Sequence, residues 1–366
     1  MPVPFTGQLN INEIYAPLYN MIISIETFAG NIEDGFSSLV DSQRVDGGLY
    51  GDTKIYVDTD ILKSYAWTGD NEASNLLNID RAPNPKTQAI ELSVFRQIPL
   101  TVDYYLSKRA WGDEYAFSSF TNVLLGWLRD TKRVYDETLF NCFVGTHVTA
   151  LGLQSQLVDF SAITSPASTA DDEAYQRIVA EKIAEHLANL FIDLKRPSRS
   201  YNDNGFMKSF SPKSLKVVWN SKYASMLRKI GTPTIFHKEG LLDTFLSEEN
   251  VLPKEYFGAV NAAATAGDGA TIRSLIEQDI GSNHYFAGDL IAVGDTAPAG
   301  TSYTVDEDKI CVVMYERAVP FMSAFQVGTS FFNARSLTEN HYLTWGHNVL
   351  EHLAGKPFIT IKAKWN

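Results

Sequence analysis

The sequence predicts an α+β protein in which β segments lie on both sides of two long helices. Apolar side chains recur every three or four residues over residues 113–144 and again over 172–195, as on the buried face of an amphipathic helix. Short alternating runs such as "TKIYVD" and "PFITIKAKW" have the two-residue period of strands. These strands and helices do not alternate strictly, which argues against a doubly wound parallel sheet.

The composition is that of a folded, acidic protein. With 366 residues, of which 45% are hydrophobic and 12% aromatic, the chain can bury a sizeable core. Its 31 basic and 43 acidic residues give a net charge of -12, which favours solubility and argues against extensive wrapping of nucleic acid. The two cysteines, Cys142 and Cys311, lie in apolar runs, so we expect buried free thiols.

Residues 1–50 predict an extended arm with one short helical piece over 18–28. They contain three prolines, and five acidic residues precede the first basic residue, Arg44. This pattern has no positively charged leader, and no apolar run approaches the ~18 residues that a membrane span requires. We therefore expect no secretion by that route and no membrane partner.

A long β-hairpin is predicted after the arm. "TKIYVD" supplies one strand, and "AIELSVFRQIPLTVDYYL" indicates a strand, a break at Pro99 and a further strand. The intervening stretch "GDNEASNLLNIDRAPNPKTQ", residues 69–88, has no sustained period. A structureless loop of about twenty residues is unusual inside a compact domain, so we expect this tip to contact another chain.

The strongest local signal is the helix over residues 113–144, which would be ~45 Å long. An ordinary core helix is the alternative, although few compact domains have a core of that length. The apolar stripe of this helix contains Phe120, Leu124, Trp127, Leu128, Tyr135 and Leu139.

The second half of the chain continues with mixed elements. The helix over 172–195 ends at Lys195-Arg196-Pro197, and "LKVVW" predicts a buried strand that leads into the helix "NSKYASMLRKIG", with Asn220 or Ser221 as its cap. Residues 235–330 indicate short strands. A short helix or strand follows in "ENHYLTWGHNVLEHL", and an alternating strand ends the chain.

No motif indicates catalysis, a cofactor or a metal. "GDGATIRSL" lacks the Gly-Lys-Ser/Thr of a phosphate loop, and no G-x-S-x-G is present. "SYNDNGFMKSFS" lacks the closing glutamate of a calcium loop and predicts a turn. His341, His347 and His352 are interpreted as partly buried histidines rather than ligands. We expect no catalytic residues, no cofactor, no metal and no enzymatic activity.

One segment reverses the acidic balance. Between residues 195 and 237, nine basic residues face a single acid, Asp203. This segment could meet acidic parts of a neighbouring subunit, contact nucleic acid, or form a solvated basic face without a partner. The basic residues are Lys195, Arg196, Arg199, Lys208, Lys213, Lys216, Lys222, Arg228 and Lys229.

The order of these elements resembles a known family. An acidic arm, a long hairpin with an unburied tip, a very long helix, a mixed segment and a terminal strand are the order found in major capsid proteins of tailed bacteriophages, which have the Hong Kong ninety-seven type fold. "KVVWNSKYASMLRKIG" is similar to the strand, Asn and helix of that family's axial domain. Arg335 and Asn340, ahead of the terminal strand, look like its closing segment.

The resemblance implies a division of the chain into named parts. These are an N-terminal arm (1–50), the extended hairpin called the E-loop (51–98), a peripheral domain with its spine helix (99–165), an axial domain (166–330) and a C-terminal return to the peripheral domain (331–366). We expect contacts between subunits at the hairpin tip and the basic segment, through Asp70, Glu72, Leu76, Leu77, Ile79, Asp80, Arg81, Lys86, Lys195, Arg196, Arg199 and Lys208.

The resemblance also implies a function and partners. Copies would form pentamers and hexamers of an icosahedral shell that encloses double-stranded DNA non-specifically, in the virion after assembly in the host cytoplasm. The further partners would be a portal protein at one vertex and a separate scaffolding or decoration protein. Two alternatives remain: an encapsulin-like nanocompartment shell, which encloses protein cargo, and an α+β enzyme of unknown chemistry.

Overall fold

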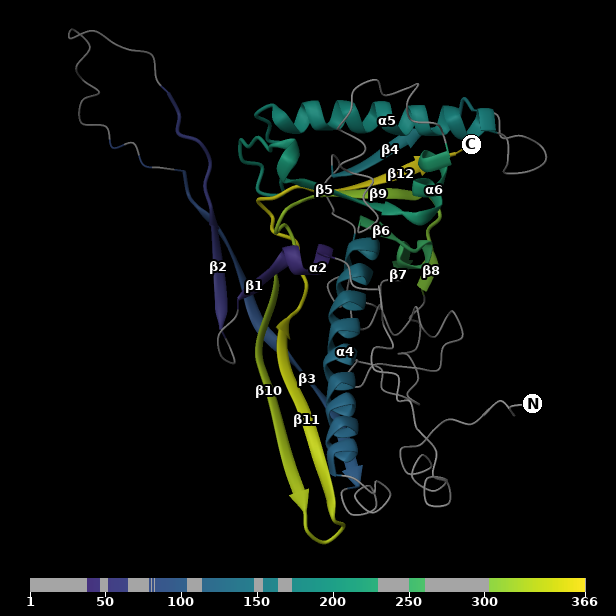
Figure 1. Cartoon of the computed structure of the whole chain (residues 1–366). Helices are drawn as coiled ribbons and strands as arrows, with labels where there is room; N and C mark the ends of the chain where they lie inside the picture. The colour runs from purple at the N-terminus through teal and green to yellow at the C-terminus, as the bar shows by residue number, and fades with distance from the viewer. Residues whose placement is uncertain are drawn as a thin grey trace.

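The protein combines two five-stranded sheets with two long helices (Figure 1). The computed structural model describes residues 38–46, 52–64, 79, 81, 83–103, 114–147, 154–163, 173–229, 250–260 and 303–365. The predicted α+β class is confirmed. The short helix expected over 18–28 lies outside the described residues.

The first sheet forms the centre of the body, with strand order β4-β12-β9-β5-β6. Its strands are β4 (Ser155–Asp159), β5 (Leu215–Asn220), β6 (Val251–Leu252), β9 (Lys309–Tyr315) and β12 (Phe358–Lys364). Helix α5 (Glu173–Lys195) covers one face, and the C-terminal end of helix α4 (Glu114–Thr146) meets the other (Figure 1).

The inner strands β5 and β9 of this sheet are buried on both faces, which explains their apolar runs. In β5, Val217 and Trp219 pack towards α5, whereas Val218 between them packs towards α4. In β9, Cys311 and Val313 likewise face the α5 side. A strand covered on both faces needs apolar residues at every position, not at every second one.

The second sheet runs alongside α4, with strand order β1-β10-β11-β3-β2 (Figure 1). Its strands are β1 (Arg44–Asp46), β2 (Thr53–Asp58), β3 (Lys86–Asp103), β10 (Phe321–Asn333) and β11 (Thr338–Asn348). The remaining elements are α2 (Ser38–Gln43), α6 (Ser221–Lys229), two 3-10 turns, Pro212–Ser214 and Lys254–Tyr256, and the two-stranded pair β7 (Gly258–Val260) and β8 (Tyr303–Val305).

Most local predictions agree with these elements. The helices expected over 113–144 and 172–195 are α4 and α5, and α5 ends at Lys195 as predicted. Asn220 caps α6, because its Oδ1 accepts a hydrogen bond of 3.1 Å from the backbone N–H of Lys222. Cys142 and Cys311 are buried free thiols. The ambiguous stretch from residue 339 is a strand, β11.

The predicted break at Pro99 is wrong, because β3 runs without interruption from Lys86 to Asp103. Pro99 faces Tyr342 of β11, whereas β2 pairs only with residues 86–91 of β3. At Pro99 the strand therefore has β11 on one side and no described strand on the other. Proline lacks a backbone N–H, and it is tolerated in a strand where an N–H at that position would point to an open edge. Strand β3 also begins within the stretch assigned to the hairpin tip.

The predicted arm over residues 1–50, extended with one short helical piece, did not include the ordered elements near its end. Residues 38–46 form α2 and β1, and Leu39 and Val40 are buried in the same core as α4. Arg44 lies 3.2 Å from the buried carboxylate of Asp136 on α4. Apolar residues and a charge pair therefore fix this end of the arm to its own chain.

Candidate inter-subunit surface

The hairpin of β2 and β3 leaves the body next to a tight turn at residues 198–208. Ser198 and Lys208 exchange two backbone hydrogen bonds of 2.8 and 2.9 Å. Buried Asn202 bridges the turn through both the N–H and the carbonyl of Phe206, at 2.9 and 2.8 Å. Gly205 has a φ of +68°, a conformation that favours glycine. The sequence predicted a turn here, and the structure shows that the hairpin rests on it.

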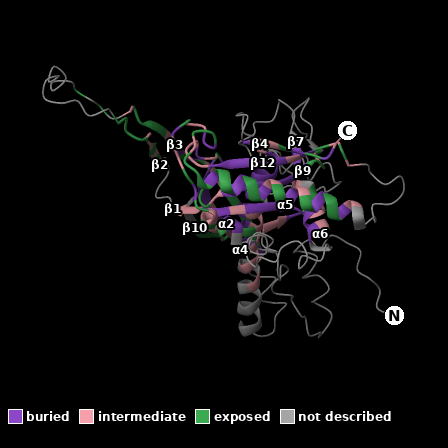
Figure 2. Cartoon of the chain, turned by 90° about the horizontal axis from the view of Figure 1, so that it is seen from above, coloured by how far each residue is buried: buried purple, intermediate pink, exposed green. Residues whose placement is uncertain are grey.

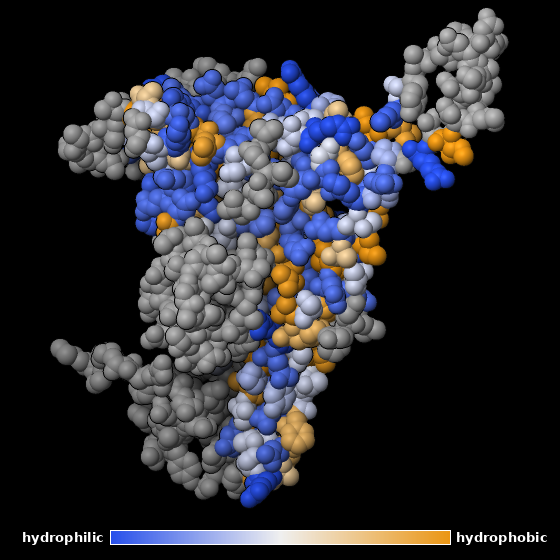
Figure 3. Space-filling model, turned by 180° about the vertical axis from the view of Figure 1, so that it is seen from behind, coloured by the Kyte–Doolittle hydropathy of each residue, from blue (hydrophilic) through white to orange (hydrophobic). Residues whose placement is uncertain are grey.

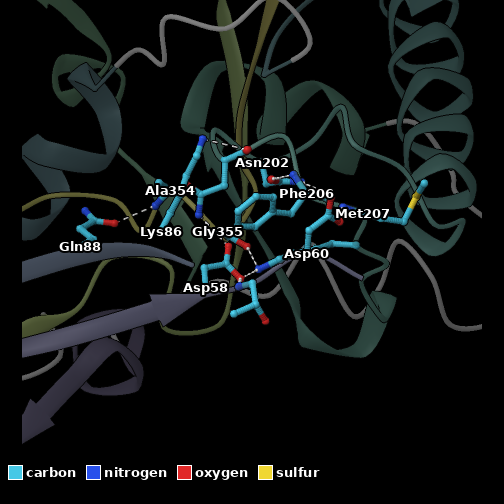
Figure 4. Close-up of polar contacts among 12 residues, drawn as sticks. Asp58, Asp60, Lys86, Gln88, Asn202, Phe206, Met207, Ala354 and Gly355 are labelled. Atoms are coloured by element: carbon cyan, nitrogen blue, oxygen red, sulfur yellow. Dashed lines mark hydrogen bonds and ion pairs between the residues drawn. The ribbon is translucent and has the colours of Figure 1, made fainter. Parts of the chain in front are cut away.

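Two aspartates at the end of β2 bind this turn (Figure 4). Asp58 pairs with Lys208 and accepts a hydrogen bond of 2.7 Å from the side chain of Asn204. Asp60 accepts a hydrogen bond of 3.0 Å from the backbone N–H of Met207 and pairs with Arg199. The Met207 N–H, followed by Arg199, lowers the pKa of the Asp60 carboxyl.

Strand β3 supplies the other half of this attachment, which we call the clasp and define as Asp58, Asp60, Lys86 and Gln88 with their partners. The ammonium of Lys86 donates to the carbonyl of Asn204 at 3.0 Å. Gln88 accepts from the backbone N–H of Ala354 at 3.0 Å (Figure 4), and it donates to the carbonyl of His352, also at 3.0 Å. Both strands of the hairpin are therefore hydrogen-bonded to the body of the same chain.

Gly355 allows the clasp to close. A Cβ atom at this position would lie 2.4 Å from Oδ2 of Asp58 and 3.0 Å from Nζ of Lys208. The first distance is well below van der Waals contact, so any larger residue would displace the Asp58 carboxylate.

Behind the clasp, two histidines and an aspartate form a hydrogen-bonded chain. Nε2 of His147 lies 2.8 Å from Nδ1 of His352, and Nε2 of His352 lies 2.6 Å from Asp203. This chain joins the end of α4 to the turn and to the loop that holds Gln88. Burial, followed by the neighbouring His352, lowers the pKa of His147 to about 3. His147 is therefore neutral at physiological pH.

A second polar chain fixes α4 to the sheet beside it. Nε of Arg96 donates to the hydroxyl of Tyr135 at 3.0 Å, and this hydroxyl lies 3.0 Å from Nε2 of buried His347. Nδ1 of His347 lies 2.9 Å from the carbonyl of Asn348, so Nδ1 carries the proton and Tyr135 donates to Nε2. Burial lowers the pKa of His347 to about 4. The histidines near the C-terminus thus have separate partners.

The hairpin exposes apolar side chains as well as polar ones. Ile55 and Val57 share one face of β2 and are 64% and 63% exposed, whereas Lys54, Tyr56 and Asp58 on the other face are half-buried. Ile61, Leu62 and Ile79 are exposed as well, Ile79 by 81%. We call these five exposed residues the hairpin stripe. Figure 3 shows apolar residues gathered on the projecting hairpin, and Figure 2 shows its exposure.

The residues predicted at the interface have different locations. Ile79 and Arg81 are exposed on the hairpin, and Lys195 and Arg196 are exposed at the end of α5. Lys86, Arg199 and Lys208 belong to the clasp. Asp70, Glu72, Leu76, Leu77 and Asp80 lie outside the described residues. The prediction omitted Ile55 and Val57, although the alternation of "TKIYVD" placed two aliphatic residues on one face of a strand.

The predicted stripe of the long helix lies on α4. Leu128, Tyr135 and Leu139 are buried in the hydrophobic core of the protein, and Trp127 is half-buried. Phe120 and Leu124 are also in α4, but their side chains lie outside the described residues.

Metal-binding clusters and membrane-spanning helices are both absent from the described residues. The described part of the chain contains no cluster of three or more His, Cys, Asp or Glu residues that could hold a metal ion. None of its described helices is both long and apolar enough to cross a membrane.

Comparison with known proteins bears on this architecture. No family model matches the sequence, and no curated protein matches it either. Among solved structures, the chain is similar to one in the capsid structure of Staphylococcus phage Andhra, with a TM-score of 0.62, 12% identity, and coverage of 94% of this chain and 88% of that one. The fold is that of a phage capsid protein.

A chain in a second phage structure is also similar to this one. That structure contains the head fiber and inner core protein gp22 of native bacteriophage P68, and the similarity has a TM-score of 0.61 and 10% identity over 93% of this chain and 88% of that one. The resemblance that the order of elements suggested is thus confirmed at the level of the fold. Because these identities are low, the likeness concerns the fold alone.

Proposed function

We propose that this chain is a major capsid protein of a tailed bacteriophage, and that its copies assemble into an icosahedral shell around double-stranded DNA. The observation that carries the proposal is the capsid-type fold, which extends over 94% of the chain. A structural role of this kind needs no catalytic group, and we propose that the chain is not an enzyme.

The hairpin stripe supports assembly by copies of the chain. A strand on a monomer normally turns its polar residues to water, but β2 turns Ile55 and Val57 outwards and Asp58 towards the body. Each such aliphatic side chain contributes about 1.5–3 kcal/mol when it becomes fully buried. One contact of this size is weak, but its repetition around every subunit gives a shell strong avidity.

The division implied by the resemblance is retained as part of this proposal, with residues 1–50 as the arm, 51–98 as the E-loop, 99–165 and 331–366 as the peripheral domain, and 166–330 as the axial domain. In this arrangement α4 is the spine helix, and the E-loop lies across a neighbouring subunit. The clasp sets the direction in which the E-loop leaves its own subunit, because both strands are bonded to the turn at 198–208 or to the loop at 351–355.

The proposed partners follow from the same role. Copies form pentamers and hexamers, a portal protein occupies one vertex, and a separate scaffolding or decoration protein assists. Packaged DNA is contacted non-specifically. The proposed location is the virion, after assembly in the host cytoplasm.

The test is electron microscopy of the purified protein and of particles from cells that express it. We expect closed shells that protect double-stranded DNA from nuclease when the packaging proteins are present. Shells that contain a protein cargo would support the encapsulin-like alternative. A small oligomer by size exclusion, with no shells under any condition, would contradict both.

The hairpin tip provides a sharper version of this test. Because β3 begins at Lys86, a deletion of residues 69–85 removes the tip and leaves the described β2–β3 pairing intact. We expect the variant to retain its circular dichroism spectrum and to lose assembly. Unfolding of the variant would show that the tip packs within its own chain.

A further inference from the structure

A groove of about 500 Å³ lies where the hairpin leaves the body. Strands β2 and β3 form one wall, and Asn204, Lys208 and residues 353–356 form the other. Three lysines line it: Lys86 from the hairpin, Lys208 from the turn, and Lys356 from the loop that follows β11. Each wall of the groove therefore carries at least one ammonium group.

Two of these lysines have no carboxylate partner among the described residues. Lys208 is neutralised by Asp58, which also lines the groove. Lys86 donates to the carbonyl of Asn204, which carries no charge, and Nζ of Lys356 lies over the ring of Tyr315, 4.1 Å from its centroid. The groove thus presents two uncompensated ammonium groups to whatever enters it.

The chain itself carries a matching acidic segment. Before Arg44 it has five acids and no Lys or Arg, and Glu33 and Asp34 are adjacent in "ETFAGNIED". We propose that the groove receives Glu33 and Asp34 of a second copy, an inference that rests on the proposed assembly. Their two carboxylates equal Lys86 and Lys356 in number and are opposite to them in charge.

The position of the groove favours a second copy over the chain's own arm. Val57 belongs to the hairpin stripe and also lines the groove. A copy that covers the stripe therefore reaches the mouth of the groove without further movement. DNA is a poorer fit, because two lysines supply few of the phosphate contacts on which such binding depends, and the net charge is -12.

Charge reversal tests the proposal on the full-length chain. We expect the groove variant, Lys86→Glu with Lys356→Glu, and the arm variant, Glu33→Lys with Asp34→Lys, each to need about tenfold more protein to assemble than the wild type. Both should keep the wild-type circular dichroism spectrum. The matched control is Lys213→Glu with Lys254→Glu, two exposed lysines outside the groove, which should assemble normally.

Mixing the two variants decides which copy supplies the acids. In an equimolar mixture, the reversed groove of one chain can accept the reversed arm of the other, and the two unreversed partners can also meet. No matched contact is available within a single chain. Recovery of assembly in the mixture is therefore expected only if the contact joins different copies. Lys356→Glu alone leaves the clasp residues unchanged and should show the same direction of effect.

Three results would overturn the inference. The groove variant could assemble as well as the control. The mixture could fail while one chain carrying all four reversals assembles, which would place the contact within a chain. Loss of assembly in the groove variant only, matched by loss of DNA retention, would indicate DNA as the occupant. In each case wild-type assembly would stand, so that the proposed function survives; failure of wild-type assembly would instead refute the function.

Discussion

The central sheet of the body and the projecting hairpin use similar strand residues in opposite ways. Strand β5 buries Val217, Val218 and Trp219 completely between α5 and the end of α4. Strand β2 exposes Ile55 and Val57, whereas Lys54, Tyr56 and Asp58 on its other face are half-buried. The first pattern completes a core within one chain, whereas the second leaves an apolar face that a single chain does not cover among its described residues.

In the proposed shell, this difference separates residues that stabilise the folded subunit from residues that join one subunit to another. Substitutions in the body should change the free energy of unfolding, because they remove contacts that every isolated subunit makes. Substitutions on the hairpin stripe should leave that free energy nearly unchanged and affect only contacts between copies. Four predictions, from the largest effect on unfolding to the smallest, test this separation.

The largest effect is expected for Trp219→Ala in β5. Trp219 is fully buried, so the substitution removes a large apolar side chain and leaves a cavity between the sheet and α5. We expect a loss of about 3–5 kcal/mol in the free energy of unfolding, measured by urea denaturation. Ile192→Ala on the exposed side of α5 is the control, with little change expected. An equal effect of both substitutions would contradict the assigned core.

Acid should destabilise the body next most strongly. The pKa values of His147 and His347 in the folded state, about 3 and about 4, lie below the ordinary value of 6.5. At a pH between each folded-state pKa and 6.5, the unfolded chain binds more protons than the folded chain. The free energy of unfolding therefore falls as the pH is lowered through 6.5. Each histidine should cost on the order of 2 kcal/mol by pH 5.

Thermal unfolding at pH 7, 6 and 5 would measure this slope. His347→Gln keeps an acceptor for Tyr135 but cannot take up a proton. The variant should therefore lose less stability than the wild type on acidification. At pH 7 it should be less stable than the wild type. A variant slope equal to that of the wild type would show that His347 does not contribute.

An intermediate effect is expected for Gly355→Ala at the clasp. The new methyl group would displace the Asp58 carboxylate from Asn204 and Lys208, at a cost of about 1 kcal/mol. Hydrogen exchange should accelerate at the base of β2 and not in the central sheet. Gly328→Ala is the matched control, because a Cβ there meets nothing within 4 Å. Unchanged exchange in β2 would mean that the clasp does not hold the hairpin.

The smallest effect on unfolding is expected for Ile55→Ser combined with Val57→Ser. These side chains are mostly exposed, so the monomer should lose less than about 0.5 kcal/mol. Assembly should nevertheless fail, as followed by sedimentation or light scattering. Leu157→Ser with Ile192→Ser, a pair of similar exposure on the body, is the control. Normal assembly of the hairpin variant would remove the stripe from the proposed interface.

Local physics explains which elements were predictable. The helical period over α4 and α5, the cap at Asn220 and the turn around Gly205 depend on neighbours a few residues apart, and the sequence displays such neighbours directly. Pro99 is instructive in the opposite sense. A proline breaks a strand only where its missing N–H is needed, and that depends on which strands lie beside it.

Local sequence patterns were enough to predict the two long helices, α6, most of the strands and the order of elements, and that order indicated the capsid-type fold; they did not predict α2. The pairing of the basic segment emerged only from tertiary contacts. Arg199 and Lys208 pair with Asp60 and Asp58 from a hairpin more than a hundred residues earlier in the same chain, and their contact with another subunit stays a prediction. Charge pairs between residues so far apart leave no periodic pattern in a sequence. A lysine or arginine could pair with any of the acidic residues, and the sequence does not show which one lies beside it.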